Sequence, residues 1–160
     1  MTAFQQLLTV LRAEQHSAQQ LLAILTKERN SLIESDSDKI VQMATNKQTV
    51  LSELEQLARQ RETILQMESF STGKDGLEAF IANQPPHNAQ QLNEVVDGLR
   101  ATATHCRDNN QINGGIVNVN RQYLHKALSL LRGRDTEVTA YGPGGEYTNQ
   151  VVRQPLIGRV

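Results

Sequence analysis

The adjacent residues His105 and Cys106 are of the types that form the nucleophile and base of thiol enzymes. On a helix, however, residues i and i+1 point about 100° apart and do not face each other. The other histidines, His16, His87 and His125, are scattered and show neither triad nor metal-ligand spacing. We therefore interpret Cys106 as a small buried thiol rather than half of a Cys-His dyad. We expect no enzymatic activity, no metal and no cofactor.

A glycine-rich stretch, Gly142-Pro143-Gly144-Gly145, is a second candidate for ligand chemistry. A phosphate-binding loop would need a Lys-Ser/Thr pair after the glycines and a strand before them, and neither pattern is present. We therefore favour a mobile turn over a phosphate site. The single cysteine cannot form an internal disulfide, which fits a reducing cytosol.

Two cations, Lys47 and Arg61, share a seven-residue row with Ile40 and Leu54, beside an apolar seam. Two interpretations are open: contact with a ligand, or snorkelling, in which the apolar stems cover the seam while the charged ends reach water. We favour snorkelling.

A polar stretch containing Asn110, Asn113, Gly114 and Gly115 interrupts another apolar row. Glycine within a helix costs about 1 kcal/mol relative to alanine, so some interaction must offset this pair. In a structural interpretation, the glycines let a neighbouring helix approach closely, and the asparagines form hydrogen bonds that set the helix register. In a functional one, the layer is loosely packed and opens for a partner. We favour the first and assign helix register or packing to Asn110, Asn113 and Gly114.

Charge and composition exclude several partners. The chain has 16 Lys+Arg against 17 Asp+Glu, a net charge of -1, and therefore lacks the basic surface that nucleic acids and anionic membranes require. Aromatic residues make up 4% of the chain and Trp is absent, so a stacking pocket is not expected. The sequence shows neither a signal peptide at its start nor a stretch of about 18 apolar residues. We expect a cytoplasmic protein with no stable membrane insertion.

Long helices must position these residues. The first glycine is Gly73 and the first proline is Pro85, so the opening segment lacks both strong helix breakers. Seven-residue apolar repeats predict a helix of about thirty residues after the N-cap Thr2, and a second helix after the turn at residues 35–38. The repeats are Phe4, Leu11, Ala18, Leu25 and Leu32 in the first helix, and Met43, Val50, Leu57 and Ile64 with Ala44, Leu51, Ala58 and Leu65 in the second.

A corner and a third long helix complete the expected body. Residues 69–88 carry a turn cluster, one short helix around Phe80, and the pair Pro85-Pro86. A third helix is expected from about Asn88 to Leu131. The fold class is therefore all-α: an elongated antiparallel bundle of three long helices plus a short connecting helix, with a flexible C-terminal tail. We expect residues 1–132 to form the bundle body and 133–160 the tail.

The chain resembles the FlgN family of flagellar export chaperones. The similarity is carried by four segments in order: Leu25-x-x-Glu28 with Leu32, Lys47-x-x-x-Leu51-x-x-Leu54 with Arg61, the run Arg107 to Gly114, and Tyr141-Gly142-Pro143-Gly144-Gly145. The chain departs from the family pattern at Gly115, where a bulky residue is common, and in a tail that continues to Val160.

The resemblance implies a function. Such chaperones bind the terminal amphipathic helices of hook-associated (hook-filament junction) proteins, prevent premature assembly and deliver them to the flagellar type III export gate. The matching position for docking to the cytosolic domain of the gate is Tyr141. We assign client binding to four apolar residues late in the third helix: Val117, Leu124, Leu128 and Leu131. The alternatives are a coiled-coil structural or signalling adaptor without a secreted client, and a chaperone for another type III substrate.

Overall fold

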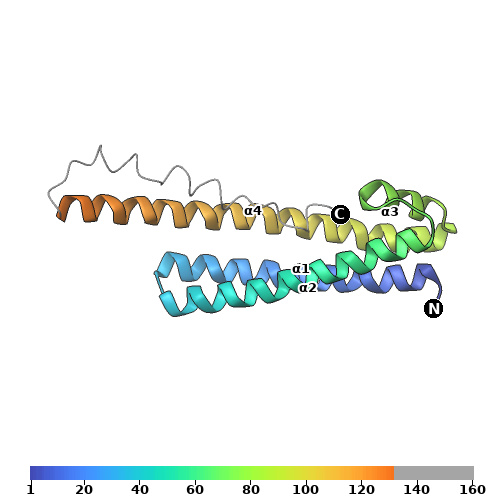
Figure 1. Ribbon diagram of the computed structural model, residues 1–160, viewed down its shortest axis with the longest axis horizontal. Helices are drawn as coiled ribbons and strands as arrows, with labels where there is room; N and C mark the ends of the chain where they lie inside the picture. Colours follow the sequence, from blue (N-terminus) through green and yellow to red (C-terminus); the bar gives the residue numbers. More distant parts are fainter. Residues whose placement is uncertain (132–160) are drawn as a thin grey trace.

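The computed structural model describes residues 1–131, and the side chains of its last helix as far as Val119, with Gln122. This part is all-helical, as the sequence predicts (Figure 1). The elements are α1 (Ala3–Glu34), α2 (Ser37–Met67), α3 (Gly73–Ala82) and α4 (Pro86–Leu131). The expected tail lies outside the described residues. No helix among residues 1–131 combines the length and hydropathy needed for a membrane span.

Local hydrogen bonds explain where the first two helices begin and end. The Thr2 side chain accepts from the Gln5 backbone and the Gln5 side chain accepts from Thr2, a capping box that starts α1 as expected. At the other end, Ser35 takes a left-handed conformation with φ 55°. The next residue, Asp36, caps α2 by accepting from the Lys39 backbone at 3.2 Å. A two-residue turn therefore reverses the chain and makes α1 and α2 antiparallel neighbours.

The first helix lies at the centre of the bundle, because α2 and α4 both pack along it (Figure 1). Contacts from Ala18 to Cys106 and from Leu25 to Asn113 follow the same order in both helices, so α1 and α4 run parallel. The shared core is aliphatic apart from Phe80 and Cys106. Its buried members are Leu7, Leu8, Leu11, Ala18, Leu21, Leu25, Val50, Leu54, Leu65, Leu77, Phe80, Ile81, Leu92, Val96, Leu99, Ala103 and Cys106.

The short helix α3 closes one end of the bundle. It buries Leu77, Phe80 and Ile81, the three residues that predicted it. The ring of Phe70, in the preceding loop, meets Phe80 edge-on, with centroids 5.4 Å apart. This apolar cluster turns the chain from α2 into α4.

At the opposite end, α4 extends beyond its neighbours. Lys47 contacts Asn110, and α2 begins ten residues before Lys47, so the start of α2 lies level with residue 120 of α4. Glu28 contacts Asn113, and α1 ends six residues after Glu28, level with residue 119. At 1.5 Å per residue, the last turns of α4 therefore project about 18 Å past the α1–α2 turn. Figure 1 shows this projecting end in orange.

Candidate functional site

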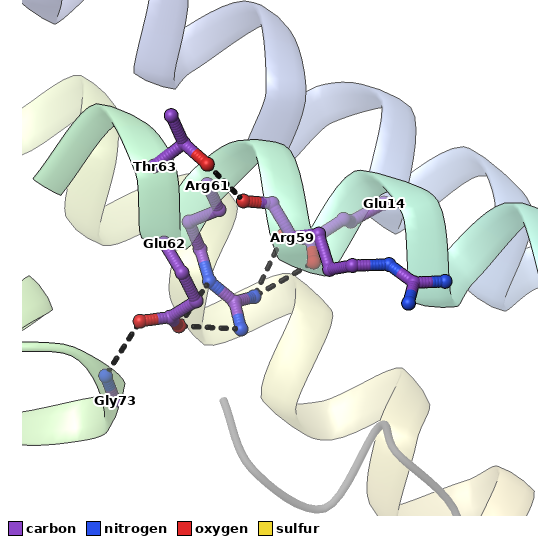
Figure 2. A network of polar contacts seen from close by, with 6 residues as sticks. All are labelled: Glu14, Arg59, Arg61, Glu62, Thr63 and Gly73. Atoms are coloured by element: carbon purple, nitrogen blue, oxygen red, sulfur yellow. Dashed lines mark hydrogen bonds and ion pairs between the residues drawn. The ribbon is translucent and has the colours of Figure 1, made fainter. Parts of the chain in front are cut away.

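A buried ion pair, Glu14 with Arg61, joins α1 to α2 (Figure 2). One terminal nitrogen of Arg61, Nη1, donates to both carboxylate oxygens of Glu14, at 2.7 and 2.8 Å. The same guanidinium donates to Oε1 of Glu62, at 3.3 Å from Nη2 and 3.4 Å from Nε. The second oxygen of Glu62 accepts from the Gly73 backbone at 2.8 Å, which ties the start of α3 to the same network.

The interpretation of Arg61 as a snorkelling cation is wrong. Its side chain is only 4% exposed, and its charged end points to Glu14 rather than to water. Burial raises the pKa of the Glu14 carboxyl above its usual 4.5, while the adjacent Arg61 charge and its hydrogen bonds oppose that shift. A buried charge of this kind is tolerated only because it is paired and hydrogen-bonded.

A second polar layer crosses all three long helices. The Lys47 ammonium on α2 lies 3.4 Å from a carboxylate oxygen of Glu28 on α1 and donates to Asn110 Oδ1 on α4 at 3.0 Å. The buried amide of Asn113 donates to Glu28 Oε1 and to the Leu25 backbone oxygen, both at 2.9 Å. Lys47 is therefore also held by protein partners, which corrects its assignment as a snorkelling side chain.

Arg29 adds a further bond from α1 to α4. Its Nε donates to Asn113 Oδ1 at 3.2 Å, and its Nη2 donates to Asn109 Oδ1. The side chain of Asn113 thus uses both its nitrogen and its oxygen, in a position that is 2% exposed. These are the contacts that a register function for Asn110 and Asn113 requires.

The two ion pairs have matched spacing. Glu14 and Glu28 are fourteen residues apart on α1, and Lys47 and Arg61 are fourteen apart on α2. In an antiparallel pair of helices, both contacts form together in one register only. Any slip along the helix axis would bury at least one charge without its partner, at a cost of several kcal/mol.

Close helix packing does not explain the glycine at position 115. A Cβ atom built on Gly115 would meet nothing within 4 Å, and the residue is exposed. The expectation of a close approach is therefore wrong at this position. Its neighbour Gly114 is half-buried and directly follows Asn113. Among the side chains that the structure describes, Asn113 is the last residue of α4 that is hydrogen-bonded to another helix, and the two glycines follow it directly.

The predicted client-binding residues all fall on the last part of α4. Val117 is 37% exposed. The backbone of Leu124, Leu128 and Leu131 belongs to the projecting end of α4, and their side chains are outside the described residues. Tyr141, predicted to dock to the export gate, also lies outside the described part of the chain.

The sequence pair His105-Cys106 is separated by the fold. Cys106 is buried and its thiol donates to the Ala18 backbone oxygen at 3.4 Å, whereas His105 is exposed. Burial raises the pKa of the Cys106 thiol to about 11, so it stays protonated at neutral pH. Among the residues that the structure describes, no three His, Cys, Asp or Glu side chains are placed to hold a metal ion.

Sequence reasoning overlooked the polar partners on α1. Glu14 and Glu28 alternate with Leu7 and Leu21 at seven-residue spacing, so the row that carries them faces the core. That pattern mirrors the row of Lys47 and Arg61 on α2, and comparing the two rows would have indicated the pairing. The described segments that resemble the FlgN family contribute Glu28, Lys47, Asn110 and Asn113, and the fold brings these residues together in one layer.

Comparison with protein-family models gives a match to the family described as FlgN protein, over residues 1–149. No curated protein and no solved structure matches the chain.

Proposed function

We propose, from the premise that this chain belongs to the FlgN protein family, that it binds the terminal amphipathic helices of hook-associated proteins through the projecting end of α4. Membership of the family implies a role as a flagellar export chaperone, and the family is not enzymatic.

The observation that carries the proposal is the length of α4 relative to its neighbours. Upstream of Asn113, one face of α4 is buried against α1 through Leu92, Val96, Leu99 and Cys106. The same helical row continues in sequence through Val117, which lies just before the level where α1 and α2 end, and then through Leu124, Leu128 and Leu131 beyond that level. Among the described residues, neither α1 nor α2 reaches the level of Leu124, Leu128 and Leu131.

Such a row suits an amphipathic client helix. Apolar residues at spacings of three, four and seven positions match the anchors by which one helix packs against another. The net charge of -1 supplies no strong field of one sign, so we expect apolar contact to dominate the affinity. Binding of this kind would keep the terminal helices of the client apart until export.

The remaining steps take place in the cytoplasm. Delivery to the export gate is assigned to Tyr141, which a short glycine-rich segment follows in sequence. Tyrosine suits docking because it offers apolar area and a hydroxyl group while few side-chain torsions are frozen.

Binding assays with purified protein and a terminal helical segment of a hook-associated protein test the proposal. Replacing Leu128 and Leu131 with Asp should weaken binding by at least tenfold, because two charges would enter an apolar contact. Val119→Asp is the matched control: Val119 is 63% exposed and lies on the opposite side of α4. Equal binding by the wild type and the Leu128→Asp/Leu131→Asp variant, with helicity retained, would exclude this surface.

Two further experiments test the docking function of Tyr141 and the alternative of a coiled-coil adaptor. Tyr141→Ala should preserve client affinity and melting temperature while binding to the cytosolic domain of the gate weakens. If the protein instead forms a stable dimer and captures no exported client from its own cytosol, the coiled-coil adaptor is the better account.

A further inference from the structure

We propose that Gly114 and Gly115 form a hinge in α4, about which segment 116–131 pivots relative to the body. The part of this segment beyond residue 120 projects past α1 and α2. The hinge itself is a property of the free chain. Its use in client binding rests on the proposed function.

The residue before the hinge is firmly held. Asn113 is 2% exposed and is bonded to α1 through Leu25, Glu28 and Arg29. One turn earlier, Asn110 accepts from Lys47 of α2. The polar layer therefore fixes α4 to both neighbours immediately before the glycines.

Among the side chains that the structure describes, those after the hinge are only partly buried, and Ile116 is half-buried. Val117 and Val119 are 37% and 63% exposed, although both are aliphatic. The neighbouring helices end level with residues 119 and 120, so little of the bundle remains to pack against. Beyond that level, the backbone hydrogen bonds of α4 itself hold the direction of the helix.

Glycine weakens that remaining restraint. It populates many backbone conformations that alanine does not, and so favours bending or opening of a helix. Two consecutive glycines stand at this one point, and at Gly115 no neighbouring atom would obstruct a side chain. Packing therefore does not explain why residue 115 is a glycine. A change in the direction of the helix where the polar layer ends does explain it.

The hinge would let the projecting segment adjust its direction as a client helix docks. A rigid rod fixed at Asn113 would present its apolar row at one angle only. With a pivot, the same row can meet client helices that differ in length and tilt. The cost is an entropy loss on binding, because the pivoting segment becomes ordered.

Distances between spin labels test the hinge in the free protein. In a Cys106→Ala background, labels at Ser37 and Gln122 span the hinge, while labels at Ser37 and Thr104 lie within the body. All three labelled positions are exposed. We expect a broad distance distribution for the first pair and a narrow one for the second. Gly115→Ala should reduce the bent population about fivefold, because alanine favours the helix.

Gly98→Ala is the matched control. Gly98 is also in α4 but lies before the polar layer, and an added Cβ would meet only the Gln15 side-chain amide, which can move. The proposal is overturned if the Ser37–Gln122 distribution is as narrow as the Ser37–Thr104 distribution, or if Gly98→Ala narrows it as much as Gly115→Ala.

Adding a hook-associated helical segment separates the two proposals. Narrowing of the Ser37–Gln122 distribution supports the use of the hinge in binding. A broad distribution that no such segment changes supports the hinge and counts against the proposed client surface.

Discussion

At the scale of single residues, the ion pair of Glu14 and Arg61 shows how a buried charge specifies structure more than it stabilises it. Removing both charges from water is costly, and the attraction between them does little more than offset that cost. Arg61 is further constrained by Glu62, which links it to the backbone of Gly73. The main effect of the pair is to raise the free energy of every arrangement in which one of the two charges is buried without the other.

Replacing Arg61 with Met should therefore destabilise the protein strongly. The substitution retains apolar volume but leaves Glu14 buried without its partner, at an expected cost of about 3–5 kcal/mol in the free energy of unfolding. Urea denaturation measures the change. The double variant Glu14→Leu/Arg61→Met should recover most of the loss, and failure to recover it would show that packing rather than charge is responsible.

The loss in Arg61→Met should depend on pH. In the wild type, burial already raises the pKa of Glu14 above 4.5, and removing Arg61 takes away the influences that lower it. In the variant, Glu14 then binds a proton more tightly in the folded state than in the unfolded state. The free energy of unfolding therefore decreases as pH rises from the unfolded pKa of Glu14 towards its higher folded pKa. The deficit relative to wild type should be larger near pH 8 than near pH 5. A constant deficit would contradict a charged Glu14 as its cause.

At the scale of elements, α2 shows the limit of reading apolar periodicity. Its strongest apolar rows predict a helix correctly and supply two of its buried residues, Val50 and Leu65. The other two, Leu54 and Arg61, come from a row that contains two cations. The spacing of apolar residues shows where apolar side chains recur along α2. Which face of α2 is buried also depends on how its side chains complement those of α1. Glu14 and Glu28 on α1 provide that complementarity for Arg61 and Lys47.

The helices themselves were predictable for a simpler reason. The capping oxygens of Thr2 and Asp36 and the long segment without Gly or Pro act locally, so they are visible in sequence. The polar layers depend on residues up to 88 positions apart, and no local pattern reports such a contact. The length of α4 could be predicted, but the level at which α1 and α2 end beside it could not.

Two glycines should respond very differently to alanine. A Cβ on Gly76 would lie 1.6 Å from the Ser71 backbone oxygen, so Gly76→Ala must displace the loop before α3. We expect a loss of about 3 kcal/mol and a fall in Tm of roughly 10 °C. Gly98→Ala, which meets only a movable side chain, should change Tm little. Thermal denaturation followed by circular dichroism compares them, and similar Tm values would contradict the placement of Ser71.

At the scale of the whole molecule, stability should be unevenly distributed along α4. The segment that contains Leu92, Val96, Leu99 and Cys106 is buried in the shared core, whereas residues 121–131 extend past the ends of α1 and α2. Amide hydrogen exchange should therefore be slow in the first segment and faster by orders of magnitude in the second. A bound client should slow exchange in the second segment. Uniform protection along free α4 would contradict an unpartnered end.

The central position of α1 also bears on how the chain folds. Ala18 meets Cys106 across 88 residues of sequence, so this contact forms only after a long segment of chain is closed into a loop. The α1–α2 hairpin needs only its two-residue turn, so it can form as soon as both helices have been synthesised. At about 5–20 residues per second, the ribosome supplies the α4 partner roughly 4–18 seconds after α1. During that interval the face of α1 that α4 will cover stays exposed. The first helix to be made is therefore among the last to be fully buried.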